Sequence, residues 1–237
     1  MRGRLARALI ALALLAAPVV GLVGAASSAP EEDRILPAES YTTEKAKAMA
    51  KAHLSALRDL NAYIYHCVPW VETEKQSIGF FKPKYLTEDD RYMSIRIFIE
   101  QDPSPAFASL DHGNRAASMF SRYVGFLLKT MTKSPEILPD PRLGGFITIL
   151  EWRKQDGSEQ KGQRPVNETI AVYVPKPVAQ EYLSGKLKID ELAHRARVLG
   201  WDGEKALGQL NLSAWDDNFV YTYKIPNYKL DPEAKCS

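Results

Sequence analysis

Histidine and cysteine are both scarce in this sequence, and no two histidines stand at a metal-ligating spacing. The H-x-x-x-H and H-E-x-x-H patterns, which place two imidazoles on one helix face, are absent. We therefore expect no metal site. The histidines are His53, His66, His112 and His194, and the cysteines are Cys67 and Cys236.

The motifs of serine nucleophiles and phosphate binding are missing as well. No G-x-S-x-G sequence offers a serine on a strained elbow. Gly144 and Gly145 precede an expected strand, and the lysine of a phosphate-binding loop does not follow them. These absences predict that the protein binds no cofactor.

Two short sequences place a histidine beside a thiol or an acid. His66 precedes Cys67, but adjacent helical residues project about 100° apart, so His66 is poorly placed as a base for that thiol. Asp111 and His112 could form half of a catalytic triad, but no serine partner is identifiable. A helix N-cap at Asp111 followed by a surface histidine is the simpler interpretation.

Only one long hydrophobic run occurs, and it lies at the N-terminus. Three arginines precede an apolar stretch at residues 8–23, and small residues follow at 23–25. This order is typical of a secretory signal peptide. An uncleaved membrane anchor is the alternative, although roughly sixteen apolar residues fall short of the ~20 that span a bilayer. We expect residues 1–25 to be removed and the protein to be periplasmic or extracellular.

Charge gives little information about partners. The full chain has 31 basic and 29 acidic residues, but three of the arginines lie in residues 1–25. Their removal leaves 28 basic residues against 29 acidic ones, a formal charge of −1. The basic character belongs to the targeting segment, and no cationic stripe indicates nucleic-acid binding. No second apolar run reaches membrane length, so we expect no membrane span in the mature chain.

Export bears directly on the two cysteines. An oxidising compartment favours a disulfide between Cys67 and Cys236. The bond would tie the C-terminal tail to the end of the first expected helix. Two free thiols, one of them on a buried helix face, are the alternative.

Hydrophobic periodicity predicts helices and strands after a flexible segment at residues 26–39. Apolar residues at helical spacing predict one helix from residue 44 to residue 67 and another that ends at residue 131, capped by Asp111 or Asn114. Strict alternation at residues 92–100 predicts the clearest strand. Other strands are expected at 77–82, 146–153, 169–174, 206–212 and 219–225, with a broken helix over 178–183 and 189–196.

This order predicts a single α+β domain over residues 40–237. The sheet should be largely antiparallel, with five to six strands and about three helices. A split β-α-β unit of the ferredoxin-like kind fits the order. A profilin-like or roadblock-like sheet, sandwiched by helices, fits it equally.

Acidic pairs and aromatic residues are the remaining candidates for a site. Glycoside hydrolysis needs two carboxylates facing one sugar, but both acidic groups precede expected strands, where solvated turn acids are the usual interpretation. Exposed tryptophan and tyrosine rings stack on sugars or anchor protein partners, and the C-terminal third is rich in them. Trp201 and Trp215 stand in expected turns. The acids are Glu88, Asp89, Asp90, Asp216 and Asp217, and the candidate binding residues are Trp201, Trp215, Tyr221 and Tyr223.

Three functions follow from these features. The first is an exported, non-enzymatic domain that binds a protein or an envelope or carbohydrate component. The second is a small exported hydrolase that uses carboxylates from the 88–90 and 216–217 turns. The third is an assembly subunit that pairs through a sheet edge, for which residues 219–225 are a candidate strand.

Overall fold

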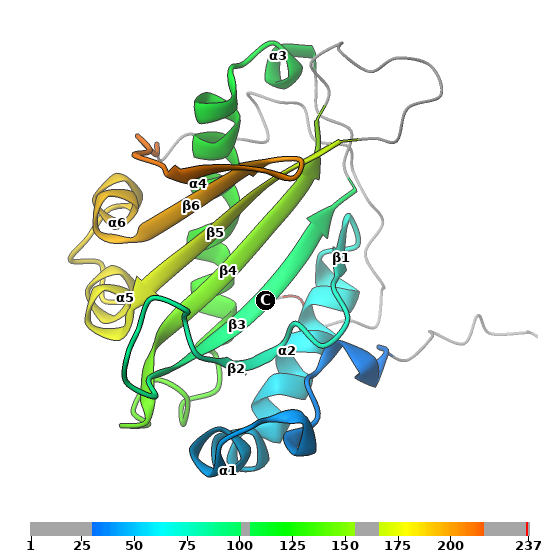
Figure 1. Ribbon diagram of the computed structural model, residues 1–237, viewed down its shortest axis with the longest axis vertical. Coiled ribbons are helices and arrows are strands. Elements are labelled where there is room, and N and C mark those ends of the chain that lie inside the picture. Colours follow the sequence, from blue (N-terminus) through cyan, green and yellow to red (C-terminus); the bar gives the residue numbers. More distant parts are fainter. Residues whose placement is uncertain (1–29, 101–104, 155–165, 216–235, 237) are drawn as a thin grey trace, which may run out of the picture.

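A seven-stranded mixed sheet forms the centre of the protein (Figure 1). The structure is a computed structural model that describes residues 30–100, 105–154, 166–215 and 236. The strand order is β1-β3-β4-β5-β6-β7, and β2 pairs with β3 on the same side as β1. The strands are β1 (Val71–Thr73), β2 (Gly79–Phe81), β3 (Arg91–Ile99), β4 (Leu143–Arg153), β5 (Asn167–Pro175), β6 (Arg197–Asp202) and β7 (Lys205–Gln209).

The described helices gather on one face of this sheet. In Figure 1, α4 passes behind the strands, α5 and α6 lie beyond the ends of β5 and β6, and α1 and α2 lie beside β2 and β3. Two short 3-10 turns, η1 (Glu32–Arg34) and η2 (Ala38–Ser40), precede them. The α-helices are α1 (Glu44–Ala52), α2 (Leu54–Cys67), α3 (Pro105–Ala108), α4 (His112–Met131), α5 (Lys176–Leu183) and α6 (Ile189–Arg195).

The core lies between the helices and the sheet. The alternation of β3 places Met93, Ile95, Ile97 and Ile99 on the covered face, each at most 2% exposed. Fully burying one such side chain stabilises the fold by about 1.5–3 kcal/mol. The buried side chains form one continuous cluster to which both halves of the sheet contribute.

The α+β class is confirmed, but the sheet is less antiparallel than the sequence predicts. β3 and β4 are hydrogen-bonded in parallel, because the chain returns through α4 before it forms β4. In a split β-α-β unit a third strand separates the two parallel strands, whereas here they are direct neighbours. The described residues also contain seven strands and six α-helices, more than the five to six and about three expected.

The expected helix over residues 44–67 is two helices. His53 ends α1 and begins α2 with φ −110° and ψ 18°, which bends the chain between them. The imidazole of His53 turns inward and lies 2.7 Å from Asp140, a partner that local periodicity does not reveal. As a result Leu54, assigned to the apolar stripe, is 37% exposed.

Two further segments differ from the prediction. Residues 30–39 belong to the segment predicted to be flexible, yet Ile35 is buried and forms a parallel bridge with Ile78. Trp201 belongs to β6 rather than to a turn, because Gly200 pairs with Ile170 in the sheet. The turn comes two residues later, where Gly203 has φ 59°.

The disulfide between Cys67 and Cys236 is confirmed. The two sulfurs are bonded, and the Cα atoms lie 5.4 Å apart. The bond joins the end of α2 to Cys236, which packs against the core. In the described part of the chain, no helix combines the length and the apolar character needed to span a bilayer.

Candidate functional site

A fully buried carboxylate lies where β4 and β5 meet the start of α4. The side chain of Glu168 is 0% exposed and accepts hydrogen bonds from Nε of Arg115 at 2.7 Å and from Nε1 of Trp152 at 2.8 Å. Nη2 of Arg115 and Nδ1 of His112 lie 2.5 and 3.0 Å from the second oxygen. Burial alone would raise the pKa of Glu168, but these hydrogen bonds lower it to about 2.

This cluster stabilises the fold and does not supply a general base. Because Glu168 is ionised and satisfied by Arg115, its carboxylate is a poor proton acceptor. An ionised carboxylate only accepts hydrogen bonds, so Nδ1 of His112 carries the proton of that contact. Nε2 of His112 is buried and has no hydrogen-bond partner among the described residues. Asp111 caps α4 by accepting from the backbone N–H of Asn114 at 2.8 Å, as the sequence predicts.

A second buried pair joins the bend between α1 and α2 to the loop before β4. Nε2 of His53 lies 2.7 Å from Asp140, and the two side chains are 7% and 5% exposed. The Arg142 guanidinium, bound to both oxygens of Asp140, holds the pKa of that carboxyl well below its usual range. The pair is closed to solvent, so it fixes the bend instead of offering a reactive group.

The face of the sheet opposite these helices has a different character, and we call it the open face. No described helix packs against it. Alternation places on it the half-buried side chains Phe98, Ile149, Tyr173, Leu199 and Trp201. Four strands contribute to this apolar surface, which runs across the sheet from β3 to β6.

Residues 82–90, which connect β2 to β3, fold over one end of the open face. The ring of Tyr85 makes an edge contact with Tyr173 at 5.4 Å between centroids and an interplanar angle of 81°. The guanidinium carbon of Arg197 lies 4.4 Å from the centroid of the Tyr85 ring. Burial raises the pKa of Tyr85, Tyr92 and Tyr173, so all three hydroxyls are protonated at neutral pH.

Two glycines make room for this aromatic cluster. A Cβ at Gly145 would lie 2.5 Å from the ring of Tyr92 and 2.3 Å from the carbonyl oxygen of Val174. A Cβ at Gly144 would lie 2.9 Å from the same ring. The ring of Tyr92 therefore lies against β4 where side chains are missing, and its hydroxyl is hydrogen-bonded to Tyr85.

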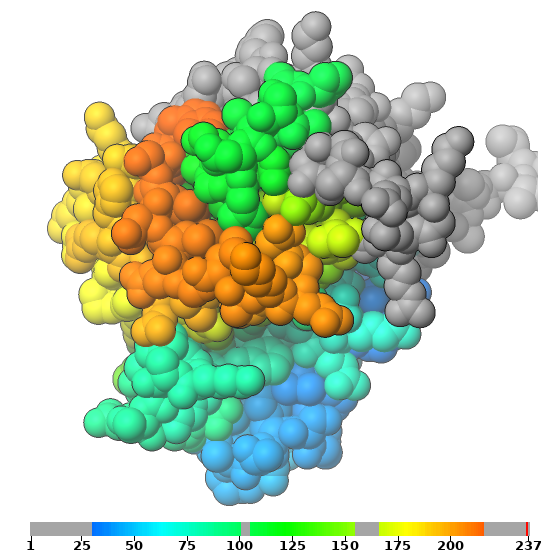
Figure 2. Space-filling model, turned by 45° about the horizontal axis from the view of Figure 1, so that its top comes forward, coloured from blue at the N-terminus to red at the C-terminus, as the bar shows by residue number. Residues whose placement is uncertain are grey.

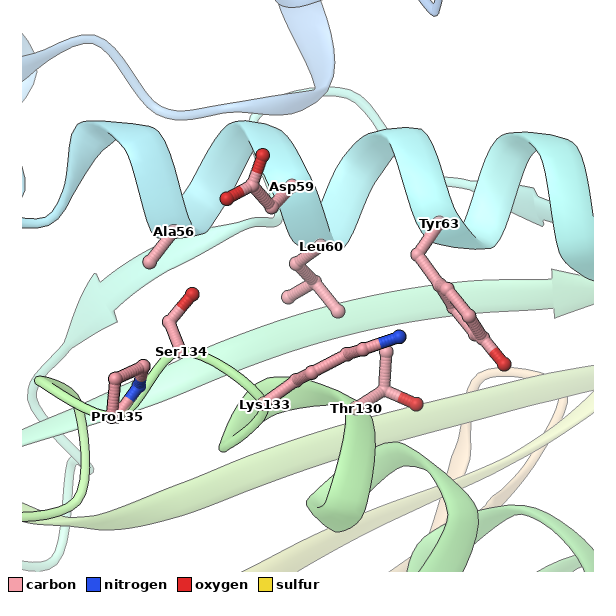
Figure 3. A pocket seen from close by; sticks show the side chains of 8 residues that line it. All are labelled: Ala56, Asp59, Leu60, Tyr63, Thr130, Lys133, Ser134 and Pro135. Carbon is pink, nitrogen blue, oxygen red and sulfur yellow. The ribbon is translucent and has the colours of Figure 1, made fainter. Parts of the chain in front are cut away.

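A separate groove lies on the helical side, between α2 and the end of α4 (Figure 3). It has a volume of about 310 Å³ and is lined by Asp59, Leu60, Tyr63 and Lys133, among others. The ammonium of Lys133 lies 5.0 Å from the centroid of the Tyr63 ring. The groove therefore holds one of its own cations against one of its own aromatic rings.

The candidate binding residues do not come together in the described structure. Trp201 lies on the open face, whereas Trp215 packs against the core on the helical side, where its backbone N–H donates to Oγ of Ser121 at 3.1 Å. Tyr221 and Tyr223 lie outside the described residues. The aromatic surface that the structure forms instead combines Trp201 with residues the sequence did not single out: Phe98, Tyr85, Tyr173 and Arg197.

Two of the three described acids of the hydrolase hypothesis form ion pairs, whereas Glu88 is exposed. Asp89 lies 2.6 Å from Nη2 of Arg91 and accepts a hydrogen bond from Thr43, the N-cap of α1. Asp90 lies 3.9 Å from Lys45. Asp216 and Asp217 lie outside the described residues. In the described part of the chain, no three His, Cys, Asp or Glu side chains form a group that could hold a metal ion.

Comparisons with known proteins give no family for this chain. No protein-family model, no curated protein and no solved structure matches it.

Proposed function

We propose that the protein is an exported binding domain whose open face holds a segment of a partner protein. The proposal is supported by one observation above all: an apolar surface drawn from four strands, with no described helix on it, is rich in aromatic residues and contains an exposed arginine. Tryptophan, tyrosine and arginine are the residues that dominate the binding energy of protein interfaces. Figure 2 shows the orange β6–β7 hairpin and the teal segment 82–90 on the same side of the molecule.

The charges around the open face indicate the chemistry of that partner. Glu151 pairs with Arg96 at 2.6 Å and accepts from Asn167. Glu72, which is opposite Phe98 in the sheet, lies 3.2 Å from Arg34. These two strand carboxylates of the open face are therefore paired within the chain. Arg197 pairs with no described carboxylate, so the uncompensated charge beside the apolar surface is positive. A segment that carries apolar and acidic side chains complements this surface.

The N-terminal pattern and the Cys67–Cys236 disulfide support an exported location for this binding. Asp89 and Asp90, two of the three described acids of the hydrolase hypothesis, are engaged in ion pairs, so that alternative has less support. The assembly alternative is pairing through a sheet edge. Its candidate strand at residues 219–225 lies outside the described residues, and β7 is an edge strand of the described sheet. A stable oligomer in size-exclusion chromatography of the mature protein would favour assembly over the proposal.

The experiment is a comparative capture with two matched leucine variants. Leu199→Glu places a charge in the middle of the open face. Leu54→Glu places the same charge at an exposed position at the start of α2. The immobilised mature proteins are incubated with envelope and secreted fractions, and bound proteins are quantified by mass spectrometry. The captured partner is then purified and titrated against each variant.

We expect a partner that binds the wild type and Leu54→Glu and is lost with Leu199→Glu. Thermal unfolding confirms that each variant is folded, and Trp201→Ala replaces Leu199→Glu if the latter is not. A set of captured proteins that is identical for all variants would overturn the proposal. So would a purified partner whose affinity is unchanged by both open-face variants.

A further inference from the structure

Arg197 on the open face differs from the arginines that form close ion pairs in the described structure. Arg91, Arg96, Arg115, Arg142 and Arg195 each lie within 2.6 Å of a carboxylate oxygen. Arg197 has no such contact with any described carboxylate. Its described contact is the face of the Tyr85 ring, at 4.4 Å.

The tyrosines around Arg197 hold its guanidinium in place. Tyr173 is its direct antiparallel partner across β5 and β6, and Tyr173 also contacts Tyr85 edge to face. Tyr85 is in turn hydrogen-bonded to Tyr92, which lies against Gly144 and Gly145. Stacking on a ring fixes the plane of a guanidinium but leaves its N–H donors unused. The guanidinium is therefore held in position, and its N–H donors are exposed, with no hydrogen-bond partner among the described residues.

The surroundings select the kind of anion. A guanidinium presents two parallel N–H donors that match the two oxygens of a carboxylate. A phosphate carries more charge and is usually held by several cations or by a helix N-terminus, whereas this cluster presents aromatic rings and one arginine. Next along β6 stands Leu199, opposite Ala171, which continues the apolar surface. A carboxylate with an apolar neighbour fits both features.

We propose that Arg197, held by Tyr85 and Tyr173, is the receptor for a glutamate or aspartate side chain of the partner protein. The inference rests on the proposed function, because it assigns one anchor to the open face. The acidic residue forms a bidentate pair with Arg197, and an adjacent apolar residue packs on Leu199. Arg197 thus determines which segment of a partner binds and in which register.

In the first test, short peptides are added as probes to the complete mature protein. The probe is the acetylated amide Leu-Glu-Leu-Glu-Leu, and its control is the same peptide with glutamine in place of glutamate. The Nε–H resonance of Arg197 is assigned in an NMR spectrum by its loss in Arg197→Gln. We expect the glutamate peptide to shift this resonance and the glutamine peptide to leave it unchanged.

Matched variants give the size of the effect. Arg197→Gln should weaken binding of the glutamate peptide by about tenfold or more, as expected when a charge-assisted pair is lost. Arg197→Lys keeps the charge but not the planar fork, and should recover only part of the affinity. Arg195→Gln is the control, because Arg195 lies two residues away but pairs with Glu181 on the helical side. It should bind as the wild type does.

Several results would overturn the inference. They are an unshifted Arg197 resonance, equal binding of the glutamine peptide, or an equal shift by inorganic phosphate, which would make the site a general anion site. The captured partner separates this failure from that of the proposed function. If the partner still binds Arg197→Gln but no longer binds Leu199→Glu, only the role of the arginine is overturned. If the partner binds both variants, the open face is overturned as the binding surface as well.

Discussion

Arg115 and Glu168 form a forked ion pair, with two nitrogens of one facing two oxygens of the other at 2.7 and 2.5 Å. Their side chains are 6% and 0% exposed. The pair joins the first turn of α4 to β5, so it connects the covering helix to the middle of the sheet. A charge pair this deeply buried makes the fold sensitive to the loss of either partner.

Removal of Glu168 should therefore destabilise the protein strongly. Glu168→Leu leaves the charge of Arg115 buried without a counter-ion, and breaking such a pair costs about 3–5 kcal/mol. The double variant Arg115→Met with Glu168→Leu removes both charges and should recover much of that loss. Urea unfolding followed by circular dichroism measures both. A single variant as stable as the wild type would show that the pair contributes little.

Acid should destabilise the protein through the same carboxylate. The pKa of Glu168 falls from 4.5 to about 2 on folding, so its contribution to stability is fully present above pH 4.5. It is lost progressively as pH falls from about 4.5 towards about 2, because the unfolded state then binds the proton more readily. The midpoint of thermal unfolding should fall over this range. Glu168→Gln should flatten this part of the profile, and an unchanged slope would contradict the assignment.

Breaking the disulfide should lower stability without changing the sheet. The bond joins residues 169 positions apart, and closing a loop of that size contributes roughly 5 kcal/mol in the chain-entropy model. The paired variant Cys67→Ser with Cys236→Ser should unfold at lower urea concentration than the oxidised wild type. The reduced wild type should match the variant. Two thiols that react with an alkylating reagent under non-reducing conditions would contradict the bond.

Gly145 and Gly113 should respond in opposite ways to alanine. A methyl group at Gly145 would overlap the Val174 carbonyl and the Tyr92 ring, neither of which can move freely, so Gly145→Ala should cost about 1–3 kcal/mol. Gly113 lies in the first turn of α4, and its nearest neighbour is Asp111 at 3.5 Å. Gly113→Ala should be neutral or stabilise by up to about 1 kcal/mol. Equal melting temperatures for both variants would contradict the packing around Tyr92.

Local sequence patterns predicted those helices and strands whose buried residues recur at a regular spacing. The alternation of β3 and the helical stripe of α4 were both correct, because each element buries one face against the same core. The Asp111 cap was also predicted, since its partner lies three residues away. β6 was missed because Gly200, Asp202 and Gly203 resemble a turn. In the structure Gly200 lies in a strand, with the Leu210 side chain packed where a side chain would otherwise stand.

The candidate site could not be predicted in the same way. Tyr85 stands in a connecting segment and Arg197 begins a late strand, and nothing near either residue in the sequence indicates the other. Their contact depends on the order of strands in the sheet. The buried contacts of Glu168 could not be predicted either, because its arginine and histidine partners are 53 and 56 positions away in the sequence. Glu168 also lies one residue before the strand expected at 169–174, so no sequence pattern indicated that it is buried.

The parallel pairing of β3 with β4 has a consequence for how quickly the protein folds. The β4–β5 and β6–β7 pairs join segments close together in the chain, so they can form early. The β3–β4 contact forms only after the whole of α4 has been placed, and the loop-closure entropy it costs is correspondingly larger. We expect the meeting of these two strands to set the folding rate, and variants along their boundary to slow folding more than variants at the sheet edges.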